Sequence, residues 1–203
     1  MKFSEIVGLT SAEDKKREFF NLIARRNLGA TVNALNVVMP NEDMNEWKIK
    51  DNVFALSPGT HGGKTLTKKD SELHGLGPGA TMSKPVLIEQ DAVIDGLTIA
   101  IRQQDGTGSM LSDPLITVKA TAKVMIRNCT FEQRDSSEAA HIHIESGGKA
   151  VVIGCVFKGA ATSSTPVVNH PVGAATDVQV AYCYNRTGNT LGSAADVTLT
   201  GNI

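Results

Sequence analysis

The sequence predicts an all-β solenoid, in which short strands stack coil upon coil behind a helical N-terminal segment. A self-similar phrase recurs down the last two-thirds of the chain, apolar and polar residues alternate within it, and its centre holds a glycine-type residue. Its copies begin at Ser71, Ala92, Val124, Ala150, Val178 and Val197. A unit of this size cannot bury its own apolar face, so we expect neighbouring copies to bury it by stacking.

Each phrase predicts two short strands joined by a corner. In the third copy Val124, Ile126, Cys129 and Phe131 are apolar, and alternation with a period of two is typical of a half-buried strand. The alternation shifts by one residue at the centre, where we expect the chain to turn. That corner position holds Gly75, Gly96, Asn128, Gly154, Tyr182 and Gly201. Glycine and asparagine tolerate a left-handed backbone, whereas a tyrosine does not, so we expect a locally different bend at Tyr182.

A further apolar run precedes each phrase, as at 85–88 and 141–144, and a segment of variable length follows it. Each coil is therefore predicted as strand, turn, strand, corner, strand and loop. The variable segments are 102–113, 132–139, 158–165 and 186–189. Length variation at one place in each coil indicates that insertions lie on a single edge of the solenoid.

This pattern, with phrases such as Val-Met-Ile-Arg-Asn-Cys-Thr-Phe at 124–131, resembles the right-handed parallel β-helix of the pectate-lyase-like superfamily, as used in trimeric bacteriophage virion proteins. The resemblance covers roughly residues 52–203 and implies a β-helix of about six coils, but it implies no specific chemistry. We expect two domains, a helical cap or attachment arm at 1–50 and the parallel β-helix at 51–203.

The N-terminal segment predicts one helix that begins at Ser11. Glu13 and Asp14 lie in its first turn, Arg25 and Arg26 in its last, and Gly29 just beyond. These charges suit the helix dipole, and glycine is favoured after a helix end.

One side of this helix is apolar and needs a cover; it consists of Phe19, Phe20, Leu22 and Ile23. Two interpretations stay open, a cap over the first coil and an arm that grips a partner. Residues 30–39 are ambiguous between helix and strand, and Trp47-Lys-Ile-Lys alternates like a strand leading into the solenoid.

The three cysteines share one position of the repeat. Cys129, Cys155 and Cys183 stand where Leu76 and Leu97 stand in earlier copies, which predicts a column of buried free thiols. An odd number of cysteines without framework spacing argues against a disulfide scaffold and for synthesis in a reducing compartment.

Charge and hydropathy exclude several classes of partner. The net charge is −1 and there is no basic run, so the sequence lacks the footprint of a nucleic-acid-binding protein. No stretch approaches the ~20 apolar residues of a membrane helix. The start, Met1-Lys-Phe-Ser-Glu, lacks the apolar core of a secretory signal, so we expect synthesis in the host cytoplasm.

The outward position just before the corner is the place to look for catalytic groups; it holds His74, Asp95, Arg127, Ile153, Ala181 and Thr200. Asp95 and Arg127 should be neighbours in adjacent coils, about 4.8 Å apart in backbone. A lyase needs a carboxylate cluster for calcium and a base, and a glycosidase needs two carboxylates. One acid beside one arginine is typical of a surface ion pair. We therefore predict no catalytic residue and no cofactor.

The only candidate metal ligands are His141, His143 and Glu145. We expect them to project to one side of a strand whose Ile142 and Ile144 point inward, and His-x-His-x-Glu can bind zinc. Further ligands are not evident in the sequence, although three copies about a threefold axis could supply them. The alternative is a strip that faces solvent or another subunit.

Three functions compete. The first is a bacteriophage virion structural protein, a decoration or cement protein that binds the major capsid protein at the capsid surface as a homotrimer. The missing secretion signal and the absence of a catalytic cluster favour it, as does the sequence stopping within a repeat phrase. The expected partner-binding residues are Phe19, Phe20, Leu22, Ile23, Trp47 and Ile203.

The two alternatives act on polysaccharide. The first is a tail spike or fibre module that binds or cleaves host polysaccharide. Such a module should have a longer β-helix and aromatic rings that stack on sugars, but only 4% of the residues are aromatic. A pectate-lyase-like polysaccharide lyase predicts secretion and a calcium site.

Overall fold

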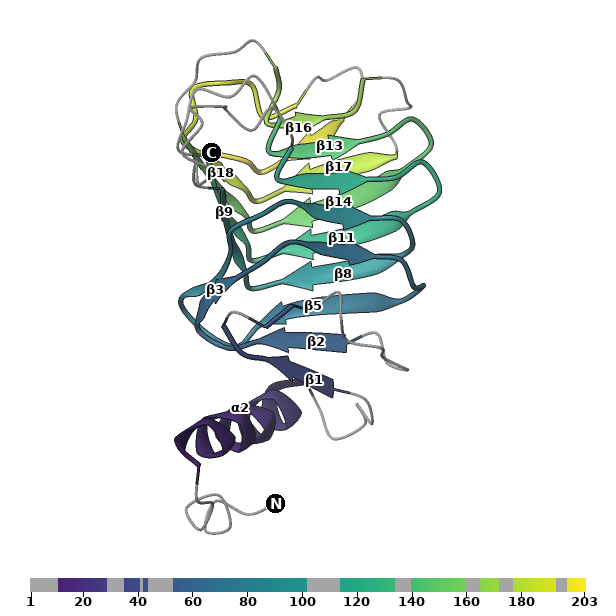
Figure 1. Ribbon diagram of the computed structural model, residues 1–203. Helices are drawn as coiled ribbons and strands as arrows, with labels where there is room; N and C mark the ends of the chain where they lie inside the picture. The colour runs from purple at the N-terminus through teal and green to yellow at the C-terminus, as the bar shows by residue number, and fades with distance from the viewer. Residues whose placement is uncertain are drawn as a thin grey trace, which may run out of the picture.

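A computed structural model of the chain describes residues 11–28, 35–40, 42–43, 53–101, 114–133, 140–159, 165–171, 177–192 and 197–203. Within these ranges the chain forms one helix and three parallel sheets around a common core (Figure 1). From β2 to β18 successive strands belong to the three sheets in turn, and strands of one sheet pair between neighbouring coils. The fold is a parallel β-helix, as the repeat predicted.

Sheet A has eight strands, β1 (Leu35–Val38), β2 (Val53–Leu56), β5 (Ser71–Gly75), β8 (Ala92–Asp95), β11 (Lys123–Arg127), β14 (Lys149–Ile153), β17 (Val178–Ala181) and β19 (Thr198–Thr200). Sheet B consists of β3 (Gly59–His61), β6 (Ala80–Met82), β9 (Thr98–Ile101), β12 (Thr130–Gln133), β15 (Val156–Gly159) and β18 (Tyr184–Asn185). Sheet C consists of β4 (Lys64–Leu66), β7 (Val86–Ile88), β10 (Ile116–Val118), β13 (Ile142–Ile144) and β16 (Val168–Asn169).

The corner residues between sheets A and B lie in register. Gly96, Asn128, Gly154 and Gly201 all have a left-handed backbone, with φ of 68°, 54°, 62° and 59°. Tyr182 has φ 54°, so the prediction of a different bend there is wrong. Its N–H donates to Thr200 O at 3.0 Å, and Gly154 N–H donates to Ala181 O at 3.1 Å. The ladder therefore imposes the same corner at a cost of roughly 1–2 kcal/mol for a residue with a Cβ.

Gly75 is a glycine for a different reason. It ends β5 and is not among the residues with positive φ. A Cβ at this position would lie 2.2 Å from Gly96 O, which is far inside van der Waals contact. The backbone of the next coil passes so close that only glycine fits.

The core is a set of columns that run through the coils. Ile94, Ile126 and Val152 are fully buried and stack in sheet A, while the rings of Phe131 and Phe157 stack with centroids 5.1 Å apart. Cys129, Cys155 and Cys183 are buried and free, as predicted. This continuous core holds the outer face of each sheet rigid.

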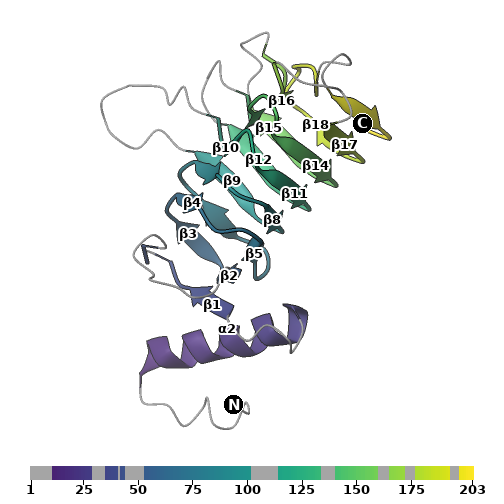
Figure 2. The ribbon, with the colours of Figure 1, turned by 90° about the vertical axis from the view of Figure 1, so that its right-hand side faces the viewer.

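The helix α2 (Ala12–Leu28) lies at the N-terminal end of the stack, next to β1 (Figures 1 and 2). The helix begins one residue after the predicted start at Ser11. Ser11 caps it, since its Oγ accepts the N–H groups of Glu13 at 3.2 Å and Asp14 at 3.3 Å. Phe20 and Met39 pack against a buried cluster of Val37, Ala55 and Leu76.

An ion pair between Arg17 and Glu42 also ties the helix to the chain after β1. Within the ambiguous segment 30–39, residues 35–38 form β1, which pairs with β2 along its whole length. The first sheet strand therefore comes before Trp47, which lies outside the described residues.

Candidate functional site

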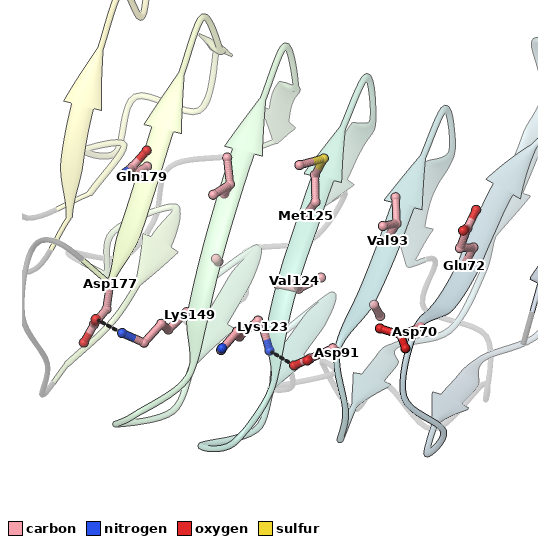
Figure 3. Close-up of a pocket in the computed structure, with 13 residues that line it drawn as sticks. Asp70, Glu72, Asp91, Val93, Lys123, Val124, Met125, Lys149, Asp177 and Gln179 are labelled. Atoms are coloured by element: carbon pink, nitrogen blue, oxygen red, sulfur yellow. Dashed lines mark hydrogen bonds and ion pairs between the residues drawn. The ribbon is translucent and has the colours of Figure 1, made fainter.

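The outer face of sheet A carries a shallow groove of about 520 Å³ (Figure 3). The outward residues of this face fall into three rows that follow the β-helix axis. The strand-start row is Asp70, Asp91, Lys123, Lys149 and Asp177; the middle row is Glu72, Val93, Met125, Val151 and Gln179; the strand-end row is His74, Asp95, Arg127, Ile153 and Ala181. The strand-start and middle rows line the groove.

Strand alternation places these side chains outside. In β11 the burial pattern alternates, so Val124 and Ile126 point into the core and Met125 points outward. Met125 is 38% exposed, which is high for a large apolar side chain on a sheet face. Val93 and Val151 flank it in register, and the floor of the groove is therefore an apolar strip.

The strand-end row contains the ion pair that the sequence predicted. Arg127 lies 3.0 Å from Asp95 Oδ2, and the side-chain amide of Asn128 donates to Asp95 Oδ1 at 3.0 Å. Both carboxylate oxygens of Asp95 are therefore engaged, by an adjacent arginine and by a corner asparagine.

His74 extends this network, and the sequence interpretation missed its partners. Its Nε2 lies 2.6 Å from Glu72 Oε2, and its Nδ1 lies 3.8 Å from Asp95 Oδ2. The His74 side chain is only 6% exposed, so the imidazole sits between two carboxylates. The spacing of Glu72 and His74, two residues apart on one strand, is the sequence signal that could have revealed the pair.

Chemically, this arrangement is closer to a structural network than to a catalytic cluster. An imidazole between carboxylates can transfer a proton. Here, however, the imidazole is buried, and Asp95 already binds Arg127 and Asn128. None of the described residues that line the groove is aromatic, so it offers no ring for a sugar to stack on.

The strand-start row has a marked charge order. Two acids, Asp70 and Asp91, precede two lysines, Lys123 and Lys149, and Asp177 follows (Figure 3). Lys149 lies 2.7 Å from Asp177, while Asp91 Oδ1 accepts the backbone N–H of Lys123 at 2.8 Å. The Asp70 carboxylate and the Lys123 ammonium form no ion pair with any residue that the structure describes.

The candidate metal ligands do not come together as predicted. His141 is 5% exposed and turns inward, with its ring edge-on to Phe157 and its Nε2 donating to Lys158 O at 3.0 Å. Only His143 faces outward from β13 itself, and Glu145 binds Lys119 at 2.6 Å. The orientation predicted for His141 is wrong because this residue precedes β13 and its ring fills space beside the phenylalanine stack.

Across the described ranges, no group of three His, Cys, Asp or Glu side chains could hold a metal ion. Burial lowers the pKa of His141, and the hydrogen bond from Lys119 lowers the pKa of Glu145.

A second cleft, of about 690 Å³, lies near the N-terminal end, and its lining includes Glu42, His61, Lys64 and Lys84. Burial lowers the pKa of both His61 and Lys64. His61 Nε2 donates to Ser57 O at 2.8 Å, whereas His61 Nδ1 and Ser57 Oγ have no hydrogen-bond partner within the described part of the chain.

The expected partner-binding residues are scattered. Phe20 belongs to the helix–sheet contact, Leu22 and Ile23 are half-buried, and Phe19 is 41% exposed. Ile203 is 85% exposed, although its N–H donates to Cys183 O at 3.0 Å and its C=O accepts from Asn185 N–H at 2.8 Å. Trp47 lies outside the described residues.

Comparisons of this chain with protein-family models, with curated proteins and with solved structures found no match. Among the residues that the structure describes, no helix has the length and apolar character needed to cross a membrane.

Proposed function

We propose that this protein is a bacteriophage virion structural protein, a decoration or cement protein that binds the major capsid protein as a homotrimer. The observation that carries the proposal is the outer face of sheet A. It exposes the apolar side chains of Val93, Met125 and Val151 beside charged residues that largely pair with one another. Such a surface suits contact with another protein chain, a second copy included, because exposed apolar patches rimmed by polar groups are typical of contact surfaces.

The state of the carboxylates supports an adhesive role over a catalytic one. Asp95, Asp177 and Glu145 each bind a basic side chain, and Glu72 binds His74. A lyase of this fold would instead leave several carboxylates free to bind calcium. The link to a virion rests on the resemblance to phage β-helices, which is an analogy of fold.

The exposed side of α2 is the second part of the proposal. Phe19 stands beside Phe20 with ring centroids 5.7 Å apart, yet Phe20 packs on the sheet while Phe19 stays 41% exposed. We assign Phe19 to the contact with the shell. In this arrangement Phe20 anchors the helix to the sheet, and Phe19 is left to bind the shell.

The test uses particles that lack the protein. Purified wild-type protein should co-sediment with such particles to a saturating ratio and appear on the head surface in electron micrographs. Phe19→Asp should lose most of this binding, while Lys158→Glu, an exposed substitution on sheet B, should keep it. Density on the tail instead of the head, or unchanged binding of Phe19→Asp, would contradict the proposal.

A tail spike or fibre module that binds or cleaves host polysaccharide is the second candidate, and the Glu72–His74–Asp95 arrangement favours it. The His74 imidazole has a carboxylate oxygen 2.6 Å from Nε2 and another 3.8 Å from Nδ1, which is an arrangement that can transfer a proton. This candidate predicts depolymerisation of acidic polysaccharide, assayed with and without calcium, and its loss in His74→Gln. No release of reducing or unsaturated ends by wild-type protein would reject it.

A further inference from the structure

The charge pattern on the outer face of sheet A is self-complementary. Along the axis, the strand-start row changes from acidic at Asp70 and Asp91 to basic at Lys123 and Lys149. The strand-end row makes the same change at the same place, from Asp95 on β8 to Arg127 on β11. Both rows therefore change sign between β8 and β11.

Within one chain this pattern leaves charges uncompensated. Lys123 and Lys149 are in register on adjacent strands, where like charges repel. Asp70 and Asp91 each come directly before the registered residues Ser71 and Ala92, so two acids also lie at neighbouring strand starts. Asp70 and the Lys123 ammonium have no ion pair with any described residue. Lys149 already pairs with Asp177 in the same chain. A partner that presents the opposite order would set an opposite charge against both Asp70 and the Lys123 ammonium.

We propose that a second copy of this chain occupies the face, related by a two-fold axis that runs parallel to the strands between β8 and β11. Such an axis reverses the order of the coils but keeps strand starts opposite strand starts. It places Asp91 opposite Lys123 of the second copy, and Asp70 opposite its Lys149. In the strand-end row it places Asp95 opposite Arg127 of the second copy.

The same operation fits the apolar floor. Met125 of each copy then lies over Val93 of the other, so the most exposed apolar side chain of the face is covered by its neighbour's floor. The alternative, a threefold axis along the β-helix, brings equal coils together. It would set Lys123 against Arg127 at the level of β11 and Asp91 against Asp95 at the level of β8. These are like charges at both central coils of the face, so this face is not the one that lines a threefold axis.

The contact is small. The strands β5, β8, β11 and β14, spaced by roughly 4.8 Å, give a footprint of about 19 Å by 17 Å. This is well below the ~800 Å² that each partner buries in a standard interface, so we expect a dissociation constant in the micromolar range. The inference does not rest on the proposed function, because a two-fold contact doubles whatever unit it joins, a monomer or a trimer.

Analytical ultracentrifugation of the full chain tests the contact directly. The mass should double with concentration across the micromolar range, and Met125→Asp should abolish the doubling. Lys149→Asp and Asp70→Lys should each weaken association about tenfold or more, and the combined variant should recover most of the loss. Lys158→Glu is the matched control, and thermal unfolding of each variant checks that it is folded.

Zero-length carbodiimide cross-linking with mass spectrometry tests the geometry. In one chain Asp70 and Lys149 are three coil spacings apart, roughly 14 Å, so a cross-link between them identifies the two-fold contact. We expect this cross-link in the associated form of the wild-type protein. The proposal would be overturned if the mass never doubled, or if it doubled without the Asp70–Lys149 cross-link. It would also be overturned if the combined variant failed to recover association, or if the protein did not associate and this face bound a polysaccharide instead.

Discussion

Single residues in this fold are constrained by the coil above or below them more than by their own neighbours in sequence. Tyr182 adopts φ 54° because the ladder fixes its backbone, and Gly75 is required because Gly96 O passes within 2.2 Å of where a Cβ would be. The two positions look alike in the repeat but are governed by different physical causes. One is a matter of backbone angle and the other of space.

This difference predicts the effect of adding one methyl group. Gly75→Ala should lower the free energy of unfolding by about 2–4 kcal/mol, because the backbones of two coils must separate. Gly62→Ala is the matched control, since an added Cβ there meets nothing within 4 Å and should change stability by less than about 0.5 kcal/mol. Urea denaturation of the two variants measures the contrast, and equal effects would show that the close approach is relieved at little cost.

Buried histidines make stability depend on pH. Burial lowers the pKa of His141 and His61 below their ordinary value of 6.5. At a pH between the folded pKa and 6.5, both are therefore neutral in the folded chain and take up a proton on unfolding. The stabilisation that these two histidines provide is fully present above pH 6.5, and it is lost as the pH falls through the pKa values that they have in the folded chain.

We therefore expect a lower urea midpoint at pH 5.5 than at pH 7.5. The difference should shrink in His141→Gln, whose amide can still donate to Lys158 O. His143→Gln, which changes an outward side chain of β13, is the control and should keep the wild-type pH dependence. If His141→Gln left the pH dependence of stability unaltered, that dependence would have to come from other groups.

The thiols behave as core groups. The hydrogen bond between the Cys155 and Cys129 thiols, together with burial, raises the pKa of Cys155 to about 12, and the pKa of Cys183 is raised as well. Since the thiolate is the reactive form, the raised pKa values protect Cys155 and Cys183 from oxidation and alkylation while the chain is folded. The hydrogen bond with Cys155 lowers the pKa of Cys129, so this thiol is protected by its burial instead.

At the scale of elements, α2 covers the N-terminal end of the stack and packs the ring of Phe20 against it. Phe20→Ala should lower the free energy of unfolding by roughly 2 kcal/mol, because the cluster around Val37 and Ala55 loses its cover. Phe19→Ala should cost less than about 1 kcal/mol, since that ring is 41% exposed. Chemical denaturation gives both values, and a larger effect for Phe19 would reverse the assignment of the anchoring and binding rings.

The elements of the solenoid were predictable because their signals are local and repeated. Period-two alternation around 124–131 fixed both strands of a coil and the cysteine column. The strand at 35–38 was not predictable, since it lies outside the repeat and gains its partner only from β2.

The site was predictable only in part. The register of the repeat predicted the Asp95–Arg127 ion pair. The inward orientation of His141 depends on the space beside the Phe157 ring, and no sequence pattern indicates that such space exists. Glu72 and His74 are two residues apart on one strand, so the alternation rule places them on the same face, whereas the outward position that the repeat aligns contains only His74 of this pair.

At the scale of the whole molecule, stability should vary along the axis. Each coil packs only on its two neighbours, so inner coils are held from both sides. We expect backbone amides of β11 and β14 to exchange with deuterium at least about tenfold more slowly than those of β2 and β17. Hydrogen-exchange mass spectrometry of native protein tests this, and uniform protection along the chain would indicate that it opens as one cooperative unit.

The shared corner geometry makes the architecture modular. Gly154 and Tyr182 have φ of 62° and 54°, so the chain leaves two successive corners in nearly the same direction although their side chains differ greatly. Excising or duplicating everything between two such points would rejoin backbone that already matches. Genetic change can therefore lengthen or shorten this molecule by whole turns, and surface features such as the groove would grow or shrink in fixed steps along with it.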